Sequence, residues 1–142
     1  MSAIRVDASL SAALARSRPA PVAVTITNTS DAPVLVNRRL APGYRDAISR
    51  ELWADIRDAD GAPAAVATID YERDLPGPED YAELDPGAAL TTVFDVFHYA
   101  RPQRPGRYAV TIVYQADEPL ARTPAGILAG EHAAAPLAVD VA

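Results

Sequence analysis

The sequence contains no cysteine and no lysine, and each absence excludes a group of activities. Without cysteine the chain has no disulfide bond, no thiol nucleophile and no thiolate metal ligand. All thirteen basic residues are arginine, so a Schiff-base lysine, a lysine-activated serine and a P-loop lysine are also excluded.

Long apolar segments are missing as well. No run approaches the ~18 consecutive apolar residues that identify a membrane-spanning helix, so no membrane insertion is expected. The N-terminal residues lack the apolar core of a signal peptide, and Asp7 interrupts their start. We therefore expect a cytoplasmic protein or, alternatively, a mature secreted form whose signal has been removed. The net charge of −6 argues against nucleic acid and anionic membranes as partners.

No motif for catalysis or metal binding is recognisable. The two histidines, His98 and His132, do not form an HExxH motif, and a zinc site would need further ligands beside them. Residues 58–61 begin like a calcium loop, but the later bidentate glutamate is missing at the required spacing. No GxSxG segment marks a serine nucleophile. The prediction is a protein without enzymatic activity, metal or cofactor.

Turn residues are distributed along the whole chain. Thirteen prolines and seven glycines divide 142 residues into short segments, which is typical of all-β proteins. A chain of this length fits one folded domain. We predict a single domain over residues 1–142, an all-β fold in which about seven to eight strands form a two-sheet antiparallel immunoglobulin-like sandwich.

Alternating apolar residues locate the strands. Residues 20–29 alternate most regularly, with Val22, Val24 and Ile26 on one face. The polar turn at residues 28–31 predicts a hairpin to a strand at 33–37, and Asp60-Gly61 predicts a second hairpin. The predicted strands cover residues 20–29, 33–37, 51–58, 66–71, 90–99, 107–114 and 137–141.

Two further segments contain residues that indicate a particular local structure. Residues 75–79 (LPGPE) contain two prolines and a glycine, so no regular structure is expected there. Tyr108 begins a late strand, where sandwich proteins have a tyrosine corner whose hydroxyl bonds the backbone upstream. Residues 120–130 predict a loop or one helical turn.

The order of several motifs resembles a known family. Residues 28–31 are followed by 78–81 with Leu84 and Pro86-Gly87, and then by 94–96 and 105–110. Together they resemble the β-sandwich domain that precedes the catalytic domain of peptidyl-Lys metalloendopeptidases, and related stand-alone bacterial proteins. A looser similarity is to BsuPI-type intracellular proteinase inhibitors. The resemblance covers roughly residues 20–142 and implies an immunoglobulin-like fold. The HExxH motif of the protease is missing, so its activity is not implied.

Two loops and one strand residue are the candidates for contact with a partner. Arginine and tyrosine anchor many protein interfaces, and prolines lower the entropy cost of ordering a loop. The first loop, residues 38–49, is basic and the second, 71–83, is rich in acids and tyrosine, while Trp53 is expected on the outward face of its strand. The alternative is that the two loops pack on each other through arginine–carboxylate pairs. The candidate residues are Arg38, Arg39, Tyr44, Arg45, Trp53, Tyr71, Glu79, Asp80 and Tyr81.

These observations favour a non-catalytic module that binds another protein through its loops or a sheet edge. The resemblance suggests an alternative, an intracellular proteinase inhibitor that acts through the Pro-rich loop 75–81. A structural component of a larger assembly, including a homo-oligomer formed through a sheet edge, is a further alternative. An enzyme with an unrecognised site would instead have a deep pocket lined by His98 or His132.

Overall fold

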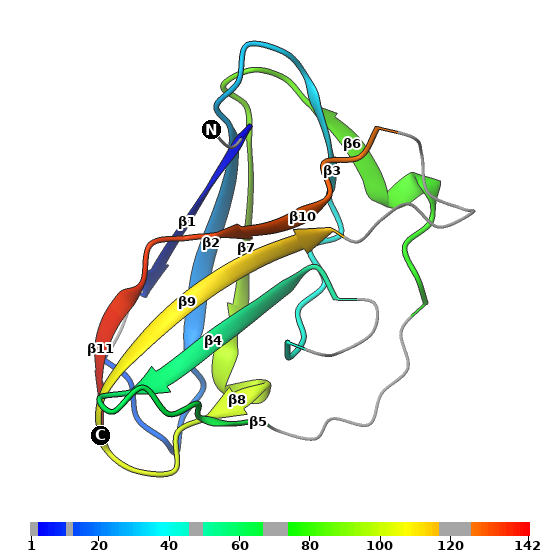
Figure 1. Ribbon diagram of the computed structural model, residues 1–142. Coiled ribbons are helices and arrows are strands. Elements are labelled where there is room, and N and C mark those ends of the chain that lie inside the picture. The colour runs from blue at the N-terminus through cyan, green and yellow to red at the C-terminus, as the bar shows by residue number, and fades with distance from the viewer. Residues whose placement is uncertain (1–2, 11–12, 46–49, 67–73, 117–125) are drawn as a thin grey trace.

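A computed structural model describes residues 3–10, 13–45, 50–66, 74–116 and 126–142, and within these ranges the chain is all-β (Figure 1). Eleven strands are present there, and the strands pair antiparallel with one another. No helix of the described part is long and apolar enough to cross a membrane. The elements are β1 (Ile4–Leu10), β2 (Pro21–Asn28), β3 (Val34–Asn37), β4 (Leu52–Asp58), β5 (Ala65–Val66), the 3-10 helix η1 (Pro78–Asp80), β6 (Tyr81–Leu84), β7 (Ala89–Asp95), the 3-10 helix η2 (Val96–His98), β8 (Ala100–Arg101), β9 (Gly106–Ala116), β10 (Gly130–Ala133) and β11 (Leu137–Val141).

The first of the larger sheets has the strand order β1-β2-β7. Its central strand β2 confirms the predicted alternation, since Val22, Val24 and Ile26 are all fully buried. On the opposite face Thr25 lies beside Thr91 of β7, and their hydroxyl oxygens are 3.2 Å apart. The sheet therefore has one apolar face toward the core and one mostly polar face toward solvent, a common arrangement in antiparallel sheets.

The second sheet is built around β9. Strand β4 pairs with one side of β9, while β10 and β11 pair with successive parts of its other side. The predicted inward set Tyr108, Val110, Ile112 and Tyr114 is buried. The long alternating stretch of β9 thus supplies one complete row of the core.

The apolar faces of the two sheets share one core. Residues of β1, β2 and β7 pack with residues of β4, β9 and β11 in a single cluster of buried side chains. In Figure 1 the second sheet crosses in front of the first. Phe97 and Val96, which follow β7, lie in the same cluster and are almost completely buried. Burial of each such side chain contributes about 1.5–3 kcal/mol to the stability of the fold.

The prediction that residues 20–29 and 33–37 form a hairpin is wrong. Strand β3 does not pair with β2; it pairs with β6, with Asn37 opposite Tyr81. The cause lies in the buried side chain of Asn28. Its Oδ1 accepts a hydrogen bond from the amide of Ser30 at 2.9 Å, and its Nδ2 donates to the carbonyl oxygens of Ala32 and Leu84. The polar turn forms as predicted, but it directs the chain toward β6.

The Asp60-Gly61 turn is present, and Gly61 has a φ of +83° that favours glycine. The amide of Gly61 donates to the carbonyl of Asp58, and Arg57 forms a bridge with Pro63. Strand β5, however, pairs with β8. The predicted hairpin is therefore confirmed only at its turn, and most of its predicted return strand, residues 66–71, lies outside the described residues.

Three other expectations need correction. No regular structure was expected near the prolines, but residues 78–80 form the short helix η1. A proline is tolerated at the first helical position because its nitrogen needs no hydrogen-bond partner there. The predicted strand 90–99 ends at Asp95, whose Oδ1 accepts from the amide of Phe97 and caps η2. Strands β1, β6, β8 and β10 were not predicted, so the expected number of strands is too low.

The predicted bond from the hydroxyl of Tyr108 to the upstream backbone is confirmed. The hydroxyl of Tyr108 donates to the carbonyl oxygen of Arg104, four residues upstream, at 2.8 Å. The ring of Tyr108 is buried, so this bond satisfies a polar group inside the core.

Candidate functional site

The two predicted loops meet at one end of the fold, which we call the loop end and define as residues 38–45 and 74–83. The pairing of β3 with β6 brings them together. The amide of Arg38 donates to the carbonyl of Asp80 at 2.7 Å, and its guanidinium donates to the carbonyl of Glu79 at 2.9 and 3.1 Å. Arg39 Nη1 donates to the carbonyl of Asp74 at 2.7 Å. The loops thus pack on each other as the alternative supposed, but these contacts use backbone carbonyls and not carboxylates.

A buried carboxylate that the sequence analysis did not select lies beneath the loop end. Glu51 is only 3% exposed. Its Oε1 accepts from Arg39 Nη2 at 2.6 Å and from Asn37 Nδ2 at 2.9 Å, and its Oε2 accepts from the amide of Ala41 at 2.6 Å. A buried charge is tolerated only when it is paired and hydrogen-bonded, and Glu51 meets both conditions.

Tyr114 extends this polar cluster into the core. Its ring is fully buried, and its hydroxyl oxygen accepts a hydrogen bond from the amide of Asn37 at 2.9 Å. Burial raises the pKa of Tyr114 to about 12, against a smaller lowering by the bond from Asn37. Burial also raises the pKa of Tyr81, partly offset by a hydrogen bond from the Asn37 side chain. Both phenols are therefore neutral at physiological pH.

The raised pKa of Tyr114 predicts a loss of stability in alkali. The unfolded state releases the phenolic proton near pH 10, while the folded state holds it until about pH 12. The contribution of Tyr114 to stability is therefore complete below pH 10 and is lost as the pH rises toward 12. We expect the free energy of unfolding to fall by about 1.4 kcal/mol per pH unit in that interval on account of this one group.

Denaturant unfolding of the wild type and of Tyr114→Phe at a series of alkaline pH values measures this slope. The variant should be less stable at neutral pH, because the amide of Asn37 loses its acceptor. Between pH 10 and 12 its free energy of unfolding should also fall less steeply with pH than that of the wild type, because one titrating group is missing. Identical slopes in the two proteins would show that Tyr114 does not titrate as described.

The cluster of Asn37, Arg39, Glu51, Tyr81 and Tyr114 joins the loop end to the core through hydrogen bonds. Its tyrosines are protonated, and the carboxylate of Glu51 is enclosed by its hydrogen-bond donors.

The remaining candidates on β4 and its neighbouring loop lie beside a small hollow. Trp53 was expected to face outward and does lie on the face away from the core cluster, but it is only 4% exposed. Its indole Nε1 donates to Gln115 Oε1 at 3.0 Å, and the guanidinium of Arg45 lies 5.4 Å from the ring centroid. Tyr44 and Arg45 line the hollow with Trp53, and its volume is about 170 Å³. Pockets for small molecules are usually about 300 Å³ or more, so this hollow is smaller than a typical small-molecule site. Tyr71 lies outside the described residues.

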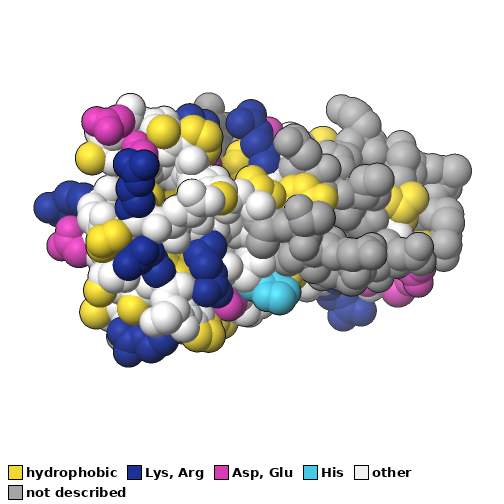
Figure 2. Space-filling model, turned by 90° about the horizontal axis from the view of Figure 1, so that it is seen from below, with side chains coloured by type: hydrophobic (Ala, Val, Ile, Leu, Met, Phe, Trp, Pro, Cys, Tyr) yellow, Lys and Arg dark blue, Asp and Glu magenta, His cyan; other side chains and the backbone are white. Residues whose placement is uncertain are grey.

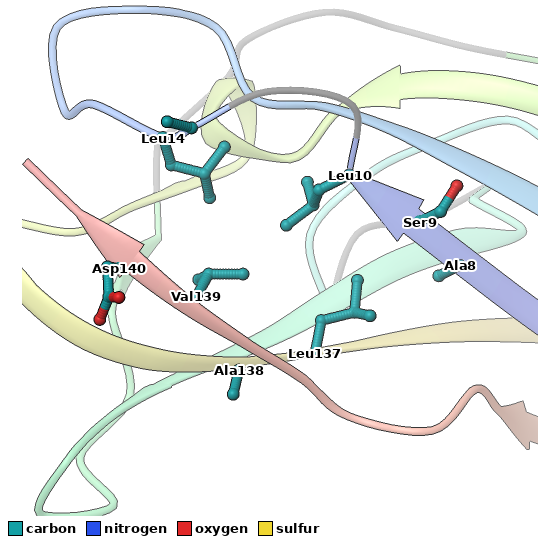
Figure 3. A pocket seen from close by; sticks show the side chains of 9 residues that line it. Ala8, Ser9, Leu10, Leu14, Leu137, Ala138, Val139 and Asp140 are labelled. Atoms are coloured by element: carbon teal, nitrogen blue, oxygen red, sulfur yellow. The ribbon is translucent and has the colours of Figure 1, made fainter.

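A larger apolar groove was not predicted. It has a volume of about 470 Å³ and lies between β1 and β11, the adjacent edges of the two sheets. Figure 3 shows the side chains of Leu10, Leu14, Leu137 and Val139 converging on the space between these strands. Ser9 and Asp140 are the polar residues of its lining. Such a surface offers apolar contact and no arrangement of acids and bases.

The histidines do not mark a site. His98 is exposed in η2 beside the ring of Tyr99, while His132 is half-buried with its ring 6.0 Å from that of Tyr114. Neither lines the hollow beside Trp53 or the groove between β1 and β11. Within the described ranges no group of three His, Asp or Glu side chains is placed to hold a metal ion.

Comparison with known proteins does not assign the chain to a family. No family model matches the chain, and no curated protein matches it. The resemblance to the sandwich domain of peptidyl-Lys metalloendopeptidases and to BsuPI-type inhibitors stays a prediction.

Proposed function

We propose that the protein is a non-catalytic interaction module on an immunoglobulin-like sandwich, and that it binds another protein through the loop end. The sheet orders β1-β2-β7 and β4-β9-β11 correspond to strands A-B-E and C-F-G of that fold. The hydroxyl bond of Tyr108 at the start of β9 is the feature expected of strand F. These correspondences support the fold assignment.

The observation that carries the binding proposal is the way in which the two loops are held. Arg38 and Arg39 bind the backbone of the opposite loop, and Glu51 anchors Arg39 from below. A surface whose backbone is already ordered loses little entropy when a partner binds. Arg38, Arg45 and Glu79 are exposed on it, so charges of both signs are available to a partner.

The proteinase-inhibitor alternative meets a specific difficulty. Residues 78–80 of the Pro-rich loop form a 3-10 turn, and the carbonyl of Glu79 is occupied by Arg38. A peptide that adds to a sheet edge in a partner needs an extended backbone with free amides and carbonyls. The loop end therefore fits recognition through side chains better than insertion as an extended segment.

Assembly through a sheet edge is a second candidate, and β7 favours it. Within the described residues β7 pairs only with β2, so its other edge is open. Residues 89–94 carry no charge, and Val93 is 60% exposed. Natural edge strands usually contain charges or prolines that prevent such pairing. Light scattering of the purified protein distinguishes a dimer from a monomer.

The proposal is tested by recovering a partner from the native host and repeating the binding with both purified proteins. Arg38→Glu and Glu79→Arg change exposed charges of the loop end, and Arg5→Glu makes an equivalent change on β1 as the control. We expect each loop variant to lose at least about tenfold in affinity, and Arg5→Glu to bind as the wild type does.

Circular dichroism must show that all three variants remain folded. Equal binding by every variant would show that the loop end is not part of the interface. Turnover of a substrate by the pure protein would show that the protein is an enzyme. If the recovered partner is a protease whose activity falls on binding, the inhibitor alternative is correct.

A further inference from the structure

Two loops at the opposite end of the fold are strongly basic. Residues 13–20 and 97–107 contain five arginines and no acidic residue, although the whole chain has a net charge of −6. We call this surface the arginine end; its arginines are Arg16, Arg18, Arg101, Arg104 and Arg107. Figure 2 looks at the molecule from below and shows arginine side chains gathered over one half of this view, with few acidic side chains between them.

The two loops are held against each other by their own arginines. Arg16 Nη1 donates to the carbonyl oxygen of Gln103 at 2.9 Å, and Arg101 Nη1 donates to the carbonyl oxygen of Arg16 at 2.8 Å. These bonds fix the loops without neutralising the guanidinium charges. In the described part of the chain, none of the five arginines forms a salt bridge with a side-chain carboxylate.

Three acids lie near this surface, and two of them, Asp140 and Asp58, offset part of its charge. Asp95 Oδ1 accepts from the amides of Ala20 and Phe97, so this carboxylate is turned toward the backbone. Asp140 lies opposite Arg107 in the pairing of β11 with β9. Asp58 shares with Arg104 the lining of a polar hollow of about 340 Å³ between the β4–β5 turn and residues 103–108. Arg18 and Arg104 are exposed, and within the described residues their guanidinium groups form no hydrogen bond or ion pair.

We propose that the arginine end binds a short acidic segment of a protein partner. A guanidinium group presents paired N–H donors that match the two oxygens of a carboxylate. Several such groups on two mutually fixed loops form a ready arrangement of donors for successive Asp or Glu side chains. This second surface is separate from the loop end and does not depend on binding there.

The charge distribution favours a short peptide over a long polyanion. Because the two loops contribute +5 to a net charge of −6, the rest of the chain carries −11. Charges are screened beyond about 8 Å at physiological salt, so a short acidic segment senses mainly the arginines. A nucleic acid or an anionic vesicle extends over the acidic remainder. On these loops the rings of Phe97 and Tyr99 are also buried and offer no face for stacking bases, and His98 is the residue whose ring is exposed.

The test uses a fluorescent oligoglutamate peptide about ten residues long, which spans about 33 Å when extended. Fluorescence anisotropy measures its binding to the full chain at low and physiological salt. We expect salt-dependent binding that weakens about tenfold in Arg18→Glu and in Arg104→Glu. Arg5→Glu, which makes the same change of charge on β1, should remain within about twofold of the wild type.

Other results overturn the proposal. Absence of peptide binding, or equal weakening by Arg5→Glu, would show that the arginine end does not recognise acidic segments. Tighter binding of a single-stranded oligonucleotide of equal charge, or of phosphatidylserine vesicles, would assign the surface to nucleic acid or to membranes. Because these variants lie outside the loop end, failure here leaves the partner proposed for that end unaffected.

Discussion

Replacing Glu51 by alanine is expected to lower the free energy of unfolding by about 3 kcal/mol, which corresponds to a fall of about 10 °C in Tm. The substitution removes the Glu51 carboxylate from Arg39 and deprives the amide of Ala41 and the side chain of Asn37 of their acceptor. Loss of one partner of a buried ion pair is costly because the other charge stays partly buried, and the Arg39 side chain is only 19% exposed. Urea unfolding and thermal melts measure the change.

Two further variants separate the causes. Glu83→Ala removes an exposed carboxylate from β6 and should change stability by less than about 0.5 kcal/mol. Glu51→Gln keeps the size and one acceptor oxygen but removes the charge, so it should fall between the wild type and Glu51→Ala. If Glu51→Ala were as stable as Glu83→Ala, the cluster would not hold the loop end.

Replacing Asn28 by alanine is expected to cost about 2–3 kcal/mol. Asn28 is 1% exposed, and its Nδ2 satisfies the buried carbonyl of Leu84 as well as that of Ala32. Its Oδ1 also accepts from the amide and the hydroxyl of Ser30. The substitution therefore weakens both the turn after β2 and the connection between β2 and the end of β6. Denaturant unfolding gives the loss.

The control for this variant lies in the same turn. Thr29 is exposed and its hydroxyl makes one long bond to the carbonyl of Ala3 at 3.3 Å, so Thr29→Ala should cost at most about 0.5 kcal/mol. Asn28→Asp keeps the acceptor for Ser30 and loses both donors, which separates the turn from the connection to Leu84. Equal stability of Asn28→Ala and Thr29→Ala would contradict the role given to Asn28.

The strands of the core were predictable because their side chains alternate regularly. The valines of β2 and the alternating row of β9 carry that pattern over their whole length. Strand β1 has a weaker version of it, with Ile4 and Val6 buried but with Ala8 in place of a large residue. Strand β10 (GEHA) has no such pattern, because its place is determined by hydrogen bonds to β9 and not by apolar side chains.

The pairing of strands was less predictable than their positions. The turn at residues 28–31 was recognised from its residue types, yet its direction depends on Asn28 bonding to Leu84, 56 residues away. The same limit applies to the loop end. Its arginines and acids were found from composition, but Glu51 looked like the first residue of an ordinary strand. Its burial arises only when β3, β6 and β9 come together around it.

The segment after β1 has a mechanical consequence. Leu14 forms a parallel bridge with Val141, the amide of Ala142 donates to Leu14, and the amide of Arg16 donates to Ala142. The chain therefore ties the first sheet to the second after leaving β1, and Figure 1 places the two termini at opposite ends of the fold. A force that pulls the termini apart acts along β1 and β11, perpendicular to the hydrogen bonds that join them to their neighbours. Those bonds bear the load together in shear, so the domain should resist stretching better than one whose terminal strands peel away bond by bond.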